Sequence, residues 1–296
     1  MFVKKMFVIG AGFMGTGIAQ NAAMKGLDVV LYDVNEAQLE KSRKTLEKEI
    51  GKLVSRGKIS EEDGQAALAR VCFTAKMKAC HDADVIIEAA SENLEIKKSI
   101  IREVDKYAKA DAVIASNTSS ISITTLASCL DDSSRFVGMH FFSPVPKMPL
   151  MEIVRGLHTS EKVIQIATET GEFMGKSCIQ AKDEAGFIVN RMLLPMLNEA
   201  CFLVERKVGT IEEIDLGMKM CLHHPMGPLE LVDMIGIDVE LAVMEVIYAE
   251  TGDSKYRPAV LFRRMVDAGF LGRKTGCGFY VYNEDGTRTP NEKIFG

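Results

Sequence analysis

The sequence has no excess of basic residues, because 36 lysines and arginines stand against 41 aspartates and glutamates. The resulting formal net charge of -5 argues against a nucleic-acid-binding protein, which normally carries a basic surface. The sequence also lacks an apolar run of membrane-spanning length. We therefore expect neither nucleic acid nor a membrane as a partner, and any polyanionic ligand must be held by local positive groups.

Closely spaced cysteines and clustered metal ligands are missing as well. The seven cysteines are odd in number, well separated and without a Cys-x-x-Cys motif, which fits reduced thiols in a cytoplasm. There are only five histidines, and the adjacent His223 and His224 have no nearby carboxylate or cysteine to complete a ligand set. We expect no metal site.

A glycine-rich turn near the start is the first positive signal. An apolar run over residues 5–10 precedes helical spacing of apolar residues over 16–25, which predicts a strand, a turn and a helix. Glycines spaced as Gly-x-Gly-x-x-Gly at such a turn permit a tight bend, close approach of a pyrophosphate and packing of helix on strand. The pattern predicts a dinucleotide site at the helix N-terminus. The turn consists of Gly10, Ala11, Gly12, Phe13, Met14 and Gly15.

The choice of dinucleotide depends on Asp33. This residue ends a second apolar run, over residues 28–33, about twenty residues past the glycines. A carboxylate there can accept hydrogen bonds from both ribose hydroxyls of NAD, and it repels the additional phosphate of NADP. Asp33 is also a candidate N-cap of the following helix. We expect NAD as the cofactor.

The first part of the chain alternates strands and helices. Further strands are expected over residues 71–74, 84–88, 112–116 and 135–140, which predicts a Rossmann-type, doubly wound α/β domain. Ligands of such sheets bind beyond the carboxyl ends of the strands. Three polar clusters follow strands here, at residues 88–92, at 117–119 and from His140 onward, although the second is also typical of a plain turn before a helix.

Nearly forty residues separate the second predicted strand from the strand at 71–74, more than one crossover helix needs. Apolar spacing over residues 39–53 predicts a long helix, and Ser60 is placed to cap another. This helical excursion carries Lys52, Arg56 and Lys58. They form either a solvated helix face or a site for a phosphorylated ligand, and the pattern alone favours the solvated face.

After Gly186 strand signals become rare. Apolar residues at helical spacing continue to about residue 208, Thr210 to Glu213 form a capping box, and Gly227-Pro228 begins another helix. At 296 residues two domains are expected, an α/β domain over 1–184 and an all-α domain over 185–296. The broad apolar faces of these helices suit a dimer interface, although an intramolecular core explains them more simply.

His140 is the histidine with the strongest chemical context. It ends the predicted strand over 135–140, where the nicotinamide of a bound NAD should project, and Glu152 follows twelve residues later in an apolar run. A carboxylate beside an imidazole fixes its tautomer and makes it a better base. The two residues are therefore a candidate base and its orienting group. A buried structural histidine and an isolated acid at a sheet edge are the alternatives.

Six segments together resemble the L-3-hydroxyacyl-CoA dehydrogenase family, in particular the compact bacterial 3-hydroxybutyryl-CoA dehydrogenases. The resemblance extends over nearly the whole chain. Its carriers are residues 10–15 (GAGFMG), 88–94 (EAASENL), 116–120 (SNTSS), 139–142 (MHFF), 186–191 (GFIVNR) and 225–231 (PMGPLEL).

The resemblance implies an NAD-dependent oxidoreductase that interconverts a short L-3-hydroxyacyl-CoA and its 3-ketoacyl-CoA. His140 would take the proton of the 3-hydroxyl, and Glu152 would orient the imidazole. The resemblance further implies a homodimer through the C-terminal helices, and it places the excursion around Lys52 in the coenzyme A site instead of on a solvated face. The implied catalytic residues are His140, Glu152, Ser119 and Asn190; the implied cofactor contacts are Gly10, Gly12, Phe13, Met14, Gly15, Asp33, Glu92, Lys97 and Asn117; the implied substrate contacts are Lys52, Ser119, Ser143 and Asn190.

Two positions depart from the commonest family pattern. Ser143 stands where many relatives have asparagine, and the shorter reach of serine puts the substrate contact there in question. Cys277 interrupts a glycine-rich segment over residues 272–280 and is expected to be neutral. The alternatives to this function are a free hydroxy-acid dehydrogenase of the 3-hydroxyisobutyrate type, which uses a lysine for proton transfer, and a non-catalytic NAD-binding relative.

Overall fold

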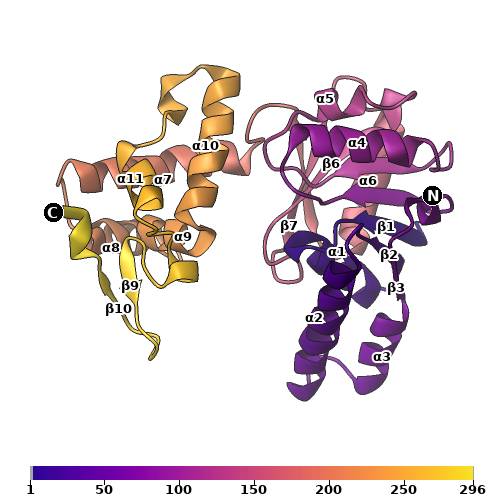
Figure 1. Cartoon of the computed structure of the whole chain (residues 1–296), viewed down its shortest axis with the longest axis horizontal. Helices are drawn as coiled ribbons and strands as arrows, with labels where there is room; N and C mark the ends of the chain where they lie inside the picture. Colours follow the sequence, from indigo (N-terminus) through magenta and orange to yellow (C-terminus); the bar gives the residue numbers. More distant parts are fainter. Residues whose placement is uncertain (1–2, 296) are drawn as a thin grey trace. The chain divides into compact units, whose positions relative to one another are not determined.

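The computed structural model describes residues 3–295, and the chain divides after Phe187 into two compact units (Figure 1). The N-terminal unit contains an eight-stranded sheet covered by helices, and the C-terminal unit is mainly helical. The predicted fold class, a Rossmann-type α/β domain followed by a helical domain, is confirmed.

The sheet has the strand order β3-β2-β1-β4-β5-β6-β7-β8. The strands from β3 to β6 in this order are parallel, whereas β7 is antiparallel to β6, and β8 is parallel to β7. The central strands are buried on both faces, which explains their nearly continuous apolar sequences. The bounds are β1 (Lys5–Ile9), β2 (Asp28–Tyr32), β3 (Val71–Thr74), β4 (Val85–Glu88), β5 (Val113–Ser116), β6 (Phe136–Phe141), β7 (Leu150–Arg155) and β8 (Ser177–Lys182).

Two hydrophobic clusters form the core of this unit. Met6 and Val8 of β1 belong to one cluster, and Phe7 and Ile9 belong to the other, because successive side chains of a strand point to opposite faces. Helices α1 and α6 contribute to the first cluster, and α4 and α5 contribute to the second. The bounds of the helices in this unit are α1 (Phe13–Met24), α2 (Glu36–Ser55), α3 (Glu61–Ala69), α4 (Leu94–Asp105), α5 (Ile123–Ala127) and α6 (Glu161–Phe173).

Strands β7 and β8 were not among the predicted strands. The interpretation of Glu152 as an isolated acid at a sheet edge is wrong, because β8 pairs with β7 on the side away from β6. The sequence of β8 alternates polar and apolar residues only weakly, since β8 is itself the edge and is partly exposed. The sequence of β8 therefore gives little indication that this strand pairs with the outer side of β7.

The predicted helical excursion is α2 and α3, which extend from the sheet between β2 and β3 (Figure 1). Leu39, Leu46 and Ile50 form the buried side of α2. The Ser60 hydroxyl accepts a hydrogen bond from the backbone N of Asp63 at 3.0 Å, so the predicted N-cap of the second helix is confirmed.

The C-terminal unit contains the predicted capping box at Thr210 and the predicted helix start at Pro228. It is not entirely α-helical, because β9 (Tyr280–Tyr282) and β10 (Arg288–Pro290) form an antiparallel hairpin. None of the helices within residues 3–295 combines the length and apolar composition needed to cross a bilayer. The bounds of the helices here are α7 (Val189–Glu205), α8 (Ile211–Leu222), α9 (Pro228–Ile235), α10 (Ile237–Thr251) and α11 (Val260–Asp267), with short 3-10 turns over 254–256, 273–275 and 292–295.

Candidate active site

The glycine turn joins β1 to α1, and glycine is suited to its three positions for different reasons. Gly10 has φ of +99°, and a side chain there would lie 2.8 Å from the carbonyl oxygen of Ala89. A side chain on Gly15 would lie 1.8 Å from the carbonyl oxygen of Gly10. A β-carbon on Gly12, in contrast, would meet no atom of residues 3–295 within 4 Å. The protein itself therefore requires two of the glycines, whereas the third leaves open backbone that a ligand can approach.

Asp33 lies directly after β2 and contacts this turn. Its Oδ2 accepts a hydrogen bond from the backbone N of Ala11 at 2.8 Å, and its Oδ1 accepts one from Asn35 at 2.9 Å. The alternative that Asp33 is the helix N-cap is wrong, because Asn35 caps α2 and accepts from the backbone N of Ala37. Each carboxylate oxygen of Asp33 keeps a second lone pair, which leaves it able to accept from ribose hydroxyls.

At the carboxyl end of β4, a buried cluster forms around Glu88. Lys97 Nζ donates to both carboxylate oxygens of Glu88 at 2.8 Å, and both side chains are only 1% exposed. Ser116 Oγ donates to Glu88 at 2.6 Å, and the backbone N of Ala90 donates at 2.7 Å. The buried charges are thus paired and hydrogen-bonded, as their burial requires. The sequence analysis assigned Glu88 no role of its own, although a charged residue at the end of an apolar strand is a signal of a functional position.

Glu92 connects this cluster to the turn after β5. One of its carboxylate oxygens accepts from Thr118 Oγ1 at 2.6 Å and from the backbone N of Ser119 at 2.9 Å, and the other lies 3.4 Å from Lys97 Nζ. Ser119 Oγ also lies within 3.3 Å of Glu92. Burial opposes ionisation of Glu92, but the charge of Lys97 and these hydrogen bonds lower its pKa below the usual value. The structure brings Glu92, Lys97 and Ser119 together, as the sequence suggested.

His140 lies on β6 opposite Glu152 on β7, in register within the antiparallel pair. Its Nδ1 is 2.7 Å from Glu152 Oε2, and both side chains are buried. An ionised carboxylate only accepts hydrogen bonds, so Nδ1 carries a proton, and in a neutral imidazole Nε2 is then the basic nitrogen. The Oδ1 of Asn117 accepts from the backbone N of Phe141 at 2.9 Å, which ties the turn after β5 to the end of β6.

Two aromatic rings flank the imidazole. The Phe142 ring centroid is 4.6 Å from that of His140 at an interplanar angle of 55°, and the Phe187 centroid is 5.6 Å away at 62°. Sequence reasoning did not assign either phenylalanine a role. Only the family motifs over residues 139–142 and 186–191, which contain the two phenylalanines, pointed to these positions. Local patterns could not, because ring contacts depend on tertiary packing.

Lys176 fixes the loop that joins His140 to Glu152. Its Nζ donates to the carbonyl oxygens of Val145 at 2.6 Å and Met148 at 2.9 Å, and the lysine is buried. Burial lowers the pKa of Lys176, and the charge of Lys25 adds to this effect. This loop carries Ser143, which is exposed. No sequence pattern pointed to Lys176.

Two further predicted substrate contacts are on helices. Lys52 is exposed on α2 and pairs with Glu49 at 2.6 Å, and Asn190 is the second residue of α7 in the C-terminal unit. The departure at Cys277 lies beside Asp233, whose carboxylate accepts from the backbone N of Phe279 and Tyr280. Burial raises the pKa of the Cys277 thiol.

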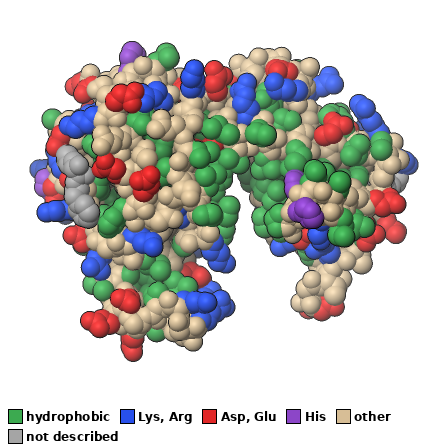
Figure 2. Space-filling view, turned by 180° about the vertical axis from the view of Figure 1, so that it is seen from behind, with side chains coloured by type: hydrophobic (Ala, Val, Ile, Leu, Met, Phe, Trp, Pro, Cys, Tyr) green, Lys and Arg blue, Asp and Glu red, His purple; other side chains and the backbone are tan. Residues whose placement is uncertain are grey.

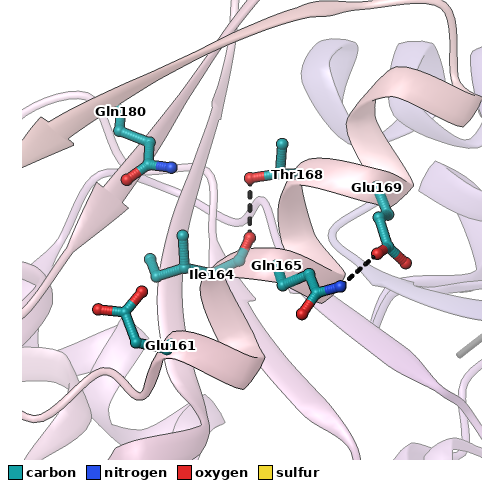
Figure 3. Close-up of a pocket in the computed structure, with 6 residues that line it drawn as sticks. All are labelled: Glu161, Ile164, Gln165, Thr168, Glu169 and Gln180. Carbon is teal, nitrogen blue, oxygen red and sulfur yellow. Dashed lines mark hydrogen bonds between the residues drawn. The ribbon is translucent and has the colours of Figure 1, made fainter.

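A surface depression of about 330 Å³ lies over α6 and β8 (Figure 3). Within it Gln165 donates to Glu169 at 2.8 Å, and Thr168 Oγ1 donates to the Ile164 carbonyl oxygen at 2.8 Å. These hydrogen bonds are local to the helix, and the residues around the depression are not among the predicted site residues. It is lined by Glu161, Ile164, Gln165, Thr168, Glu169 and Gln180.

Comparison with known proteins agrees with this geometry. Residues 5–184 match the NAD binding domain of 3-hydroxyacyl-CoA dehydrogenase, and residues 186–282 match the C-terminal domain of the same enzyme. The chain belongs to the 3-hydroxyacyl-CoA dehydrogenase family. The predicted resemblance is therefore confirmed.

Several members of this family are similar over almost the whole chain. A probable 3-hydroxybutyryl-CoA dehydrogenase of Deinococcus radiodurans is 46% identical over 278 residues, which cover 94% of this chain and 100% of the relative. One of Bacillus subtilis is 43% identical, with 96% of this chain and 99% of the relative covered. The crystal structure of (S)-3-hydroxybutyryl-CoA dehydrogenase from Ralstonia eutropha has a TM-score of 0.92 at 46% identity and covers 96% of this chain and 100% of that one.

The residues at the turn fit the NAD of this family. Gly12 leaves backbone open to a pyrophosphate, α1 begins at Phe13 with its N-terminus at the turn, and Asp33 lies beside Ala11. The N-terminal unit thus has the NAD-binding character that the sequence predicted.

Proposed function

We propose that this protein catalyses the NAD-dependent interconversion of a short-chain L-3-hydroxyacyl-CoA and its 3-ketoacyl-CoA, with 3-hydroxybutyryl-CoA and acetoacetyl-CoA as the pair. The observation that carries the proposal is the buried hydrogen bond between His140 and Glu152, at the same end of the sheet as the glycine turn, where the parallel strands β1 and β6 end. The names of the relatives from Deinococcus radiodurans and Bacillus subtilis support a 3-hydroxybutyryl-CoA substrate.

In this proposal His140 is the general base. Its Nε2 takes the proton of the substrate 3-hydroxyl, while Glu152 holds Nδ1 and stabilises the positive charge that forms on the ring. NAD, when bound, would supply the hydride acceptor for C3. In the reverse direction the protonated imidazole returns the proton to the ketone oxygen.

The remaining residues bind and orient. We assign Asp33 to the adenosine ribose, and Glu92, Lys97 and Asn117 to the nicotinamide half of the site. Phe13 is 71% exposed beside the turn, together with the less exposed Met14, and both are assigned to the cofactor surface.

We assign Ser119, Ser143 and Asn190 to the substrate and Lys52 to the coenzyme A nucleotide. Ser119 is held by Glu92, which supports a fixed orientation of its hydroxyl. Lys52 lies on an excursion that carries lysine and arginine side chains, alongside acidic ones (Figure 2).

The helical part of the chain, from about residue 185, is proposed to bind substrate and to form a homodimer. Large apolar side chains are exposed on α7 and α8, among them Met192 and Met220, which are 75% and 71% exposed. Figure 2 shows hydrophobic side chains at the surface of this unit.

We also propose a cytoplasmic location, in which the seven free cysteines stay reduced.

Loss of NADH absorbance tests the function. Acetoacetyl-CoA should be reduced rapidly, longer 3-ketoacyl-CoAs define the chain-length preference, and free acetoacetate should react poorly. Faster reduction of free acetoacetate would favour the hydroxy-acid dehydrogenase instead. Absence of turnover with every compound, while NADH still binds, would favour a non-catalytic relative.

A further inference from the structure

Phe187 has an unusual backbone for a bulky residue. Its φ is +49°, in the left-handed region that side chains with a β-carbon rarely adopt. The preceding Gly186 has φ of +76°, which glycine adopts without cost. A non-glycine residue persists in this conformation only where its surroundings fix it, and such positions concentrate at functional sites.

The segment before Phe187 is firmly anchored. The carboxylate of Asp183 accepts from the backbone N of Ile123 at 2.8 Å and of Thr124 at 2.7 Å, which fixes the segment to the start of α5. The backbone N of Phe187 donates to the carbonyl oxygen of Glu184 at 2.9 Å. The Phe187 side chain is 4% exposed and packs in the second hydrophobic cluster of the N-terminal unit. Anchoring and burial together hold the left-handed backbone.

The Phe187 ring contacts the imidazole of His140 at an interplanar angle of 62°. The hydrogen bond from Nδ1 to Glu152 fixes one atom of the imidazole but allows the ring to tilt about that contact. Phe142 restrains the ring with a centroid distance of 4.6 Å, and Phe187 adds a second aromatic contact at 5.6 Å. Aromatic pairs of this geometry prefer defined orientations, so they limit the tilt.

We propose that Phe187 is a positioning residue whose ring fixes the plane of the His140 imidazole and so aims Nε2 at the substrate hydroxyl. This inference rests on the proposed role of His140 as the base. Phe187 is also the last residue of the N-terminal unit, and α7 begins two residues later. Phe187 therefore contacts the imidazole through its ring, and its backbone belongs to the segment that connects the two units.

The test removes the Phe187 ring in two ways. Phe187→Met keeps an apolar, flexible side chain of similar length, and Phe187→Gly removes the side chain while relieving the left-handed strain. We expect both to lower kcat with acetoacetyl-CoA by roughly tenfold or more, as misplacement of a reacting group does. The KM for NADH should change less than twofold.

Lys207→Gly is the matched control, because Lys207 also has a left-handed φ, of +53°, but is exposed at the end of α7. It should keep wild-type kcat. If Phe187→Met and Phe187→Gly both keep wild-type kcat, the inference is overturned. If one of the two variants fails to fold, the other decides. A His140→Gln variant with wild-type kcat would instead overturn the proposed function, so the two failures are distinguishable.

Discussion

At the scale of single residues, the chemistry of the site depends on one short hydrogen bond between His140 and Glu152. Replacing His140 with glutamine should keep the fold and NADH binding but lower kcat by roughly a hundredfold or more, the usual effect of losing a general base. Glu152→Gln should also lower kcat. Because the neutral amide cannot stabilise the positive imidazole that protonates the ketone, the alkaline limb of the pH–rate profile for acetoacetyl-CoA reduction should move to lower pH.

Steady-state rates with acetoacetyl-CoA between pH 5 and pH 9 check both changes. A Glu152→Gln profile that superimposes on the wild type after scaling would mean that the carboxylate does not influence the base. A near-normal rate for His140→Gln would remove this residue from the mechanism.

The carboxylate of Asp33 should decide between the two nicotinamide cofactors. Asp33→Ala removes the ribose acceptor and the charge that repels the 2′-phosphate of NADP, so the ratio of kcat/KM for NADH to that for NADPH should fall. Asp28→Ala, an exposed change at the other end of β2, is the control and should leave the ratio unchanged. If Asp33→Ala also leaves it unchanged, Asp33 only orders the turn through Ala11 and Asn35.

Single residues could be predicted from the sequence where local geometry alone decides their position. The glycine turn and Asp33 follow directly from a strand, a turn and a helix, and both lie as the sequence indicated. Lys176 and Phe187 could not be predicted from pattern, because their partners are a loop carbonyl and a ring distant in the sequence. Tertiary packing, and not local preference, gives these residues their roles.

At the scale of elements, α10 contains a carboxyl group that lowers stability at neutral pH. Glu240 is 1% exposed, and within residues 3–295 its Oε1 has no hydrogen-bond partner. Burial raises the pKa of Glu240 to about 8. As the pH rises from the ordinary value of 4.5 to about 8, the unfolded chain releases this proton and the folded chain retains it, so the free energy of unfolding falls.

The loss over this interval is on the order of 5 kcal/mol, from 1.36 kcal/mol for each pKa unit. Glu240→Gln should therefore be more stable than the wild type at pH 8, with little advantage at pH 4.5, as measured by urea unfolding. Glu245→Gln on the exposed part of α10 is the control and should alter stability only slightly at either pH. Equal slopes of stability against pH for wild type and Glu240→Gln would refute the role of this carboxyl group.

The basic residues of the helical excursion have two interpretations, a coenzyme A site or a solvated helix face. If Lys52, Arg56 and Lys58 bind the coenzyme A nucleotide, their triple replacement by glutamine should raise the KM for acetoacetyl-CoA and weaken its salt dependence, with kcat unchanged. If they are a solvated face, the kinetics should not change beyond fractions of a kcal/mol. The surface pair of Lys52 with Glu49 is compatible with either.

Replacing Lys41, Lys44 and Lys48 on the same helix gives a matched control with the same loss of charge. A truncated thioester without the nucleotide should be indifferent to both triple variants. Equal effects of the two variants on acetoacetyl-CoA would mean that total charge, and not the three predicted residues, governs binding.

Elements were predictable where their periodicity is strong. The helices of the excursion and the capping box at Thr210 were predicted because caps and apolar spacing are local signals. Strand β8 and the hairpin of β9 and β10 were missed, because short strands that are partly exposed have no clear alternation. Without β8, Glu152 looked like an edge residue, although the sheet continues beyond it.

At the scale of the whole molecule, the oligomeric state depends on which exposed apolar faces a second copy covers. Leu216 and Met220 are four residues apart on α8 and are 56% and 71% exposed, so they lie on one face of this helix. Exposed apolar faces of this kind are typical of interfaces between copies. Leu216→Asp combined with Met220→Asp should therefore convert the proposed dimer into a single chain, because two charges cannot be buried unpaired in an apolar interface.

Sedimentation velocity at several protein concentrations measures the change. Leu157→Asp is the matched control, because Leu157 is 85% exposed but belongs to the N-terminal unit, and it should leave the dimer intact. A wild type that sediments as a single chain at every concentration would end the dimer proposal. A double variant that stays dimeric would place the interface away from this face of α8, because an apolar contact there could not accommodate the aspartates of both copies.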